Sequence, residues 1–143
     1  MLPFNLPLPV GFSTAPLWNG VEFEIGDQCV PVLEYSENFA GWSDDLTVLH
    51  EEAAGGSHPI DLASRHDALA QVKKCLPQGL GVVMEIGCSP GFLIKDLASA
   101  FPNATIVGAD VVKQPLYHLA ETLSGIPLIR FDLLQCPLST ANL

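Results

Sequence analysis

The C-terminal two thirds of the chain alternates short apolar runs with segments of helical period. The runs 82–86, 105–109 and 127–131 are bounded by glycine, proline or aspartate, which predicts three buried strands. In the intervening segments 91–100 and 114–123, apolar residues recur at helical spacing, which predicts two helices. This alternation of strands and helices indicates a parallel sheet with right-handed connections.

A further helix is predicted ahead of the first of these strands. From residue 60 onwards apolar side chains recur at helical spacing, and Pro77 and Gly79 end the pattern. We therefore expect a helix over 60–76 with one apolar face. That face carries Leu62, Leu69, Val72 and Leu76.

The N-terminal segment has a different pattern. Residues 1–20 mix prolines with scattered apolar residues, which indicates an extended arm. The stretches 21–25 and 29–35 alternate around the turn Gly26-Asp27-Gln28, which predicts a hairpin. We expect the arm to cover the apolar face of this hairpin.

Residues 36–59 carry the weakest pattern. Ser43 and the acids that follow it favour a short helix ending before Gly55. The run HEEAA at 50–54 lacks the second histidine of an H-E-x-x-H zinc motif, so we expect no metal site. The side chains that could still meet in space around a metal are His50, Glu51, His58 and Asp61.

The composition is typical of a globular domain. The 143 residues are 48% hydrophobic and 15% charged, which excludes a disordered chain. No apolar run approaches the roughly 18 residues of a membrane helix. The first residues lack the basic start of a secretory signal. We therefore expect a cytoplasmic protein with no membrane partner.

The charge balance weighs against a nucleic-acid partner. The net charge is −10, from 16 acidic and 6 basic residues, and the basic residues are scattered. Proteins that hold a phosphate backbone normally show a basic patch, so we expect neither DNA nor RNA as a partner. The four cysteines form no C-x-x-C pair, which favours buried free thiols over a zinc cluster or disulfides.

The segment 87–91 (GCSPG) predicts a ligand-binding turn between the first strand and its helix. Glycine permits a sharp reversal and a close approach of a ligand to the main chain. The first amides of the following helix favour an anionic group. Ser89 followed by Pro90 is a favourable helix start, with the serine as N-cap.

The spacing of this turn separates two classes of cofactor. A dinucleotide fingerprint that begins at Gly87 needs glycine at positions 89 and 92, which hold Ser89 and Phe92. What remains is an acid, Glu85, followed by glycines at the first and last positions of the turn. The pattern therefore disfavours a nicotinamide dinucleotide.

This pattern resembles motif I of the class I S-adenosylmethionine (SAM)-dependent methyltransferases. In that family an acid ends the first strand and the glycine turn carries the methionine moiety of SAM. The family usually has a middle glycine where this chain has Ser89. The resemblance covers about 80–136 and implies SAM as the cofactor. It assigns to SAM the residues Glu85, Gly87, Cys88, Ser89 and Gly91.

Asp110 follows the second predicted strand, about 20 residues after the turn. Doubly wound nucleotide sites carry a carboxylate at this place, because a charged acceptor at a strand end can take both ribose hydroxyls. We therefore predict that Asp110, with the adjoining Val111, binds the ribose of the cofactor.

The resemblance implies further contacts on either side of these strands. After the third strand, Asp132 and Leu133 match the position that meets the adenine. The helix at 60–76 and the loop before it would cover the cofactor. The residues that would then face its methionine end are His58, Asp61 and Arg65, with Arg65 near the carboxylate.

The implied fold class is α/β: a Rossmann-like parallel sheet, incomplete with three strands, with helices on both faces and an N-terminal extension. We expect residues 1–59 to form the arm, hairpin and lid-like extension, and residues 60–143 a SAM-binding half-domain. In the family three or four more strands follow and supply much of the acceptor site. We therefore expect a fragment truncated at its C-terminus, or a sheet completed at the 82–86 edge by a second copy or another chain. An exposed edge there would cause dimerisation or aggregation, unless the N-terminal strands of 21–35 cover it.

Three functions are compatible with this sequence. The first is methyl transfer from SAM to an acceptor that we expect to be a small molecule, by in-line displacement that depends on positioning. On that hypothesis, the chain alone binds SAM weakly and transfers no methyl group. The second is an NAD(P)- or nucleotide-binding oxidoreductase, and the third a non-catalytic SAM-binding or partner-binding half-domain. The sequence assigns no catalytic residue.

Overall fold

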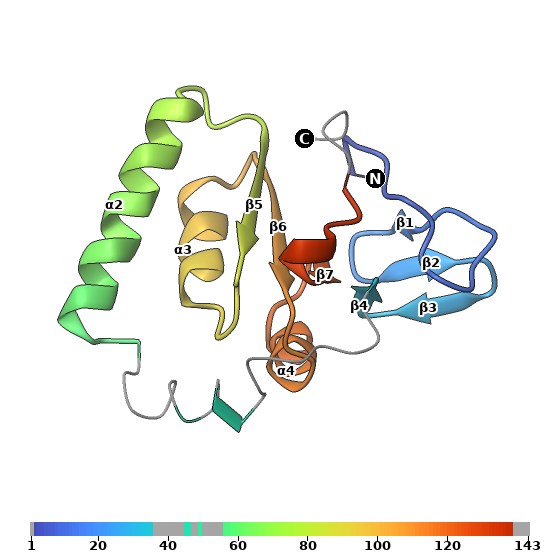
Figure 1. Cartoon of the computed structure of the whole chain (residues 1–143). Coiled ribbons are helices and arrows are strands. Elements are labelled where there is room, and N and C mark those ends of the chain that lie inside the picture. The colour runs from blue at the N-terminus through green and yellow to red at the C-terminus, as the bar shows by residue number, and fades with distance from the viewer. Residues whose placement is uncertain (1, 36–44, 47–48, 50–55, 139–143) are drawn as a thin grey trace.

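The computed structural model describes residues 2–35, 45–46, 49 and 56–138. Its centre is a four-stranded parallel sheet in the order β4-β7-β6-β5 (Figure 1). These strands are β4 (Val32–Glu34), β5 (Val82–Ile86), β6 (Thr105–Asp110) and β7 (Leu128–Arg130). The predicted α/β fold is thus confirmed, with β5 beside β6 and β6 beside β7 as the sequence indicates.

The helices have the order that the sequence predicts. They are α2 (Pro59–Cys75), α3 (Phe92–Ala100) and α4 (Gln114–Thr122), and a short 3-10 helix, η1 (Leu133–Gln135), follows β7. Each of α3 and α4 connects two neighbouring parallel strands, as expected for crossover connections. The carboxyl ends of the strands therefore meet at one edge of the sheet, where ligands bind in folds of this class.

The predicted hairpin is only partly correct. A separate antiparallel sheet joins β1 (Leu17–Trp18), β2 (Phe23–Ile25) and β3 (Gln28–Val30). The stretch expected as one strand over 29–35 is divided at Pro31, because proline has no N–H for a continuous ladder. Its second part, β4, leaves the hairpin and pairs with β7 in the parallel sheet, which therefore has four strands instead of three.

The two faces of the parallel sheet are covered by different layers (Figure 1). One core joins the sheet to α3 and α4, and Leu69 and Val72 of α2 pack against it. The other core joins the sheet to the arm and to β1–β3, through side chains such as Trp18 and Phe23. The second face is thus covered by the N-terminal segments instead of helices, because these segments supply the apolar residues that bury it.

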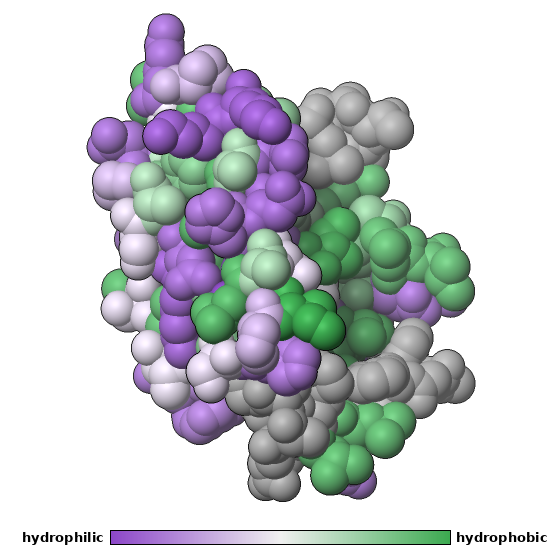
Figure 2. All heavy atoms as spheres, turned by 90° about the vertical axis from the view of Figure 1, so that its left-hand side faces the viewer, coloured by the Kyte–Doolittle hydropathy of each residue, from purple (hydrophilic) through white to green (hydrophobic). Residues whose placement is uncertain are grey.

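The helix α2 forms the outer flank next to α3. None of its residues is buried, and Leu62, expected on its apolar face, is exposed. Figure 2 views the molecule from this side and shows many hydrophilic residues, with hydrophobic residues gathered toward the right of the view. The predicted apolar face is therefore confined to the residues of α2 that touch the core, Leu69 and Val72.

Several smaller expectations need correction or lie outside the described residues. The four cysteines are free, but only Cys88 is buried. Most of the helix expected from Ser43 onwards lies outside the described ranges. The candidate metal ligands His50 and Glu51 lie outside them as well. No helix of the described part is long and apolar enough to cross a membrane. The boundary between an N-terminal extension, 1–59, and a half-domain, 60–143, stays a prediction. The strand β4 of the first part pairs with β7 of the second.

Candidate functional site

The glycine turn is held against the end of β6 by main-chain hydrogen bonds. The amides of Gly87 and Cys88 both donate to the Ala109 carbonyl, at 2.8 and 3.1 Å. The Gly91 amide donates to the Cys88 carbonyl at 2.7 Å, which closes the turn. The turn is therefore fixed at the carboxyl ends of β5 and β6.

The two glycines of this turn have different physical roles. Both have positive φ, 82° at Gly87 and 95° at Gly91, which favours glycine. A Cβ at Gly91 would lie 2.4 Å from a methyl group of Leu119, so α4 packs where a side chain would be. A Cβ at Gly87 would meet nothing within 4 Å, so its main chain faces open space. Gly87 is thus the position where a ligand can approach the backbone.

The helix after the turn begins differently from the prediction. The N-cap of α3 is Gly91, in the left-handed conformation, and no side chain caps the helix. Ser89 lies two residues earlier, and its amide donates to the carboxylate of Asp110 at 2.9 Å. Ser89 therefore contributes to the turn through its main chain, because the tight turn through Gly91 displaces it from the cap position.

Asp110 connects the turn to the second strand. Its Oδ2 accepts the Ser89 amide, and its Oδ1 accepts the amides of Val111 and Val112 at 2.7 and 3.3 Å. The structure thus brings together the glycine turn and the acid that the sequence places at the ribose. Ribose binding by Asp110 and Val111 stays a prediction.

Glu85 carries a clear electrostatic signal of a site. Burial, together with the negative charges of Asp110 and Asp96, raises its pKa to about 7. Its Oε2 is buried without a hydrogen-bond partner among the described residues, and so is the Oγ of Ser89. Buried polar atoms are normally paired, so these two atoms fit a polar ligand at the turn.

Cys88 belongs to the packing of the turn. It is buried in the core under α3 and α4, and a Cβ at Gly108 would lie 3.0 Å from its sulfur. Burial, with Asp110 and Glu85 nearby, raises the pKa of its thiol above the ordinary range. The thiol is therefore protonated and packs as a small apolar group.

The three predicted residues of α2 and the loop before it divide into two groups. Arg65 lies over the ring of Phe92 at 5.4 Å, and its guanidinium donates to the Gly56 carbonyl at 3.0 Å. Its Nε is 3.2 Å from Asp96 Oδ2, an ion pair whose angle does not make a hydrogen bond. Arg65 thus joins α2 to the start of α3, close to the turn.

The other two residues, His58 and Asp61, are 3.9 Å apart at the start of α2, and both side chains are well exposed. The structure gives them no contact with the turn. Their role at the cofactor stays a prediction.

Asp132 lies two residues after β7 and caps η1. Its Oδ1 accepts the Leu134 amide at 2.9 Å, so the carboxylate is engaged by its own loop. Leu133, the first residue of η1, is exposed. Contact of these residues with adenine stays a prediction.

Two charged groups near the turn were not identified in the sequence. Asp96 is a polar position of α3 with no motif around it. Arg130 offers a clearer signal, because it is a charged residue within the apolar run of β7 and is buried in the structure. A buried arginine needs partners, which the structure supplies from β4 and from the loop after β6.

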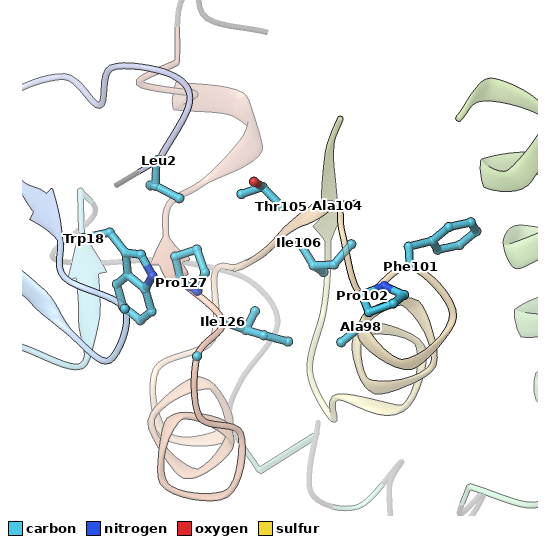
Figure 3. Close-up of a pocket in the computed structure, with 12 residues that line it drawn as sticks. Leu2, Trp18, Ala98, Phe101, Pro102, Ala104, Thr105, Ile106, Ile126 and Pro127 are labelled. Atoms are coloured by element: carbon cyan, nitrogen blue, oxygen red, sulfur yellow. The ribbon is translucent and has the colours of Figure 1, made fainter. Parts of the chain in front are cut away.

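The described residues also line two cavities, of which the second adjoins the turn at Pro90. One, of about 340 Å³, lies at the opposite end of the sheet and is lined by Trp18, Phe101, Ile126 and other mostly apolar residues (Figure 3). The other, of about 370 Å³, lies between α3 and α4 beside Pro90 and Lys95. Among the described residues, no three His, Cys, Asp or Glu side chains are grouped so as to hold a metal ion.

Comparison with known proteins gives one partial similarity at the level of sequence. A stretch of 54 residues, 38% of this chain, is 39% identical to the "tRNA (guanine-N(7)-)-methyltransferase" of Chloroflexus aggregans (strain MD-66 / DSM 9485). The chain covers 24% of that protein. No family model and no solved structure matches the chain. The chain is thus distantly and partially similar to a methyltransferase.

Proposed function

We propose that this chain is the SAM-binding part of a SAM-dependent methyltransferase. The observation that carries the proposal is the buried oxygen of Glu85, which has no hydrogen-bond partner among the described residues, beside the open backbone of Gly87 and the carboxylate of Asp110. The partial similarity to a methyltransferase supports the same cofactor independently of this geometry.

The residues of the turn supply binding and orientation. Glu85, when ionised, would hold the ammonium group of the methionine moiety, and the open main chain at Gly87 would take the moiety itself. Asp110 would accept the ribose hydroxyls, since its carboxylate has capacity beyond the main-chain amides it already binds. SAM supplies an electrophilic methyl group, and the protein's part is to hold it in line with the acceptor.

The acceptor is the second part of the proposal. The name of the relative favours RNA, so the expectation that nucleic acid is no partner finds no support. In the described residues, however, three of the six basic side chains, those of Arg65, Lys113 and Arg130, pair with carboxylates of this chain. We therefore propose that other residues or a second chain hold the acceptor, and that the open edge of β5 receives them.

Separate titrations with three ligands test which cofactor the chain binds. Calorimetric titration of the chain with SAM, with its demethylated product and with NAD is expected to show binding of the first two only. A parallel assay with labelled SAM and transfer RNA, with added free guanosine as a small-molecule acceptor, tests the transfer step. Binding of NAD in place of SAM would overturn the proposal in favour of an oxidoreductase.

A further inference from the structure

The last residues of three neighbouring strands form a row of alternating charge at the carboxyl edge of the sheet. Glu34 of β4 is in register with Arg130 of β7, and Arg130 is in register with Asp110 of β6. The row therefore connects the N-terminal segment to the acid of the candidate site. These residues are far apart in the sequence, and the register of the sheet brings them together.

Arg130 is the buried centre of this row. Its Nη1 donates to Glu34 Oε2 at 2.9 Å, and its Nε donates to the Val111 carbonyl at 2.9 Å. Charge-assisted bonds of this length are strong and direct the planar guanidinium. The side chain thus spans from β4 to the residue that follows Asp110.

Glu34 is held by more than one partner. Its Oε1 accepts the hydroxyl of Tyr117 at 2.6 Å and lies 3.3 Å from Nζ of Lys113. Burial raises the pKa of Glu34, but the bonds from Tyr117, Arg130 and Lys113 outweigh it and leave the pKa below its usual value. Glu34 is therefore ionised at neutral pH and fixes Arg130 and the start of α4 together.

Side chains of two neighbouring strands, Asp110 of β6 and Arg130 of β7, hold the loop after β6. Asp110 Oδ1 accepts hydrogen bonds from the amides of Val111 and Val112, and Arg130 donates one to the carbonyl of Val111. The Phe131 amide also donates to the Asp110 carbonyl at 3.0 Å. The position of the Asp110 carboxylate thus depends on a peptide that Arg130 anchors.

We infer that Glu34 and Arg130 are positioning residues for the cofactor, which hold the 110–112 loop so that Asp110 presents its carboxylate to the ribose. The inference rests on the proposed function. It makes the N-terminal strand β4 part of the cofactor site, although it is remote from the glycine turn in sequence. An ion pair that serves only stability would leave the affinity of the folded protein unchanged.

A double-mutant cycle distinguishes these roles. Arg130→Lys removes the fork that joins Val111 to Glu34, and Asp110→Asn weakens the carboxylate that the loop presents. Each single change is expected to weaken binding of the demethylated product of SAM by roughly tenfold, the size of one charge-assisted bond. If Arg130 acts through Asp110, Arg130→Lys in the Asp110→Asn background causes little further loss. Losses that multiply in the double variant would overturn the inference.

A ligand-free measurement keeps the test valid if the protein binds no SAM. Amide chemical shifts of Ser89, Val111 and Val112 are expected to move in Glu34→Gln while the remaining spectrum stays that of the folded chain. The matched control is Glu121→Gln, which breaks the exposed His118–Glu121 pair at 3.5 Å on α4 and is expected to move none of the three.

The outcomes separate the proposed SAM binding from the inferred role of Glu34 and Arg130. If the wild-type chain binds neither SAM nor its product, the proposed function and the role toward the cofactor both fail, and the amide shifts decide only whether Glu34 and Arg130 hold the 110–112 loop. If Glu34→Gln fails to fold, Tyr117→Phe removes one bond to Glu34 and takes its place. Unmoved amides in the folded variant would contradict the inference.

Discussion

The two edges of the parallel sheet differ in what covers them. At the β4 edge, Val32 and Leu33 are 1% and 0% exposed, because α4 lies on one face and the arm with β1–β3 on the other. At the β5 edge, Val82 and Ile86 are 43% and 52% exposed. Both β4 and β5 are terminal strands of the ladder, so in each of them alternate residues point their amides and carbonyls away from the partner; in β5 these residues are Val82, Met84 and Ile86.

The pKa values of the glutamates on the two edge strands are shifted in opposite directions, because their side chains have different neighbours. Glu34, at the end of β4, has cationic and hydroxyl partners that lower its pKa. Glu85, next to the end of β5, has burial and two neighbouring carboxylates that raise its pKa to about 7. Glu34 at the β4 edge is thus paired with side chains of this chain, whereas Glu85 at the β5 edge has an oxygen without a hydrogen-bond partner among the described residues. The exposed β5 edge therefore lies beside the candidate site at the glycine turn.

The largest expected difference between the edges is in stability. Leu33→Ala removes a fully buried side chain and is expected to lower the free energy of unfolding by about 2–5 kcal/mol. Val82→Ala removes a half-exposed side chain and is expected to cost less than about 1 kcal/mol. Urea unfolding of both variants measures the contrast. Equal losses would show that the β5 edge is as well packed as the β4 edge.

The second expected difference is in association. We expect the β5 edge to pair with another chain, so that light scattering of the wild type shows mass rising with concentration. Val82→Lys introduces an edge charge and is expected to weaken this association roughly tenfold. Leu17→Lys, at another exposed apolar residue of an edge strand, is the control and should leave it unchanged. A wild type that stays monomeric at every concentration would contradict the proposal for this edge.

The third expected difference is in pH dependence. The raised pKa of Glu85 means that stability is fully present below about pH 4.5, the unfolded value, and falls as pH rises toward about 7. Glu85→Gln should therefore be about 1–2 kcal/mol more stable than the wild type at pH 8, after allowance for solvent screening, and equal to it at pH 4.

Glu34 at the β4 edge gives the opposite pH dependence. Because the pKa of Glu34 is lowered, its contribution is present above about pH 4.5 and is lost as pH falls through the folded value. Glu34→Gln should therefore be less stable than the wild type at pH 7 and approach it in acid. Thermal unfolding at several pH values measures both variants, and slopes of the same sign would contradict the electrostatic contrast.

The sequence predicts the middle of this fold well and its periphery poorly. The strands β5, β6 and β7 are local apolar runs with turn residues on both sides, and Asp110 follows one of them at a fixed distance from the glycine turn. The strand β4 lies within the alternating stretch 29–35 but pairs with a segment almost a hundred positions away, so the local pattern predicts a strand and not its partner. The same distance hides the contact between Glu34 and Arg130.

Two residues around the candidate site show how tertiary packing selects the partner of a polar group; the Ser89 N-cap is wrong, whereas the contact of Arg65 with the cofactor stays a prediction. Ser89 has the composition of an N-cap, but the tight turn through Gly91 moves the cap to the glycine. Arg65 has the charge to meet a carboxylate, and the structure pairs it with Asp96 of α3. Sequence indicates which groups a segment carries, whereas the choice between partners is made by tertiary packing.

The most direct test of the account is SAM affinity as a function of Asp110 and of pH, measured by calorimetry. Wild-type affinity is expected to rise from pH 6 to pH 8, because Glu85 ionises near pH 7 and can then hold an ammonium group. Asp110→Ala removes charge-assisted bonds worth about 1.5–3 kcal/mol, so affinity should fall roughly ten- to hundredfold at either pH. Unchanged SAM affinity in Asp110→Ala, or an affinity that falls between pH 6 and pH 8, would contradict the assignment of this turn to the cofactor.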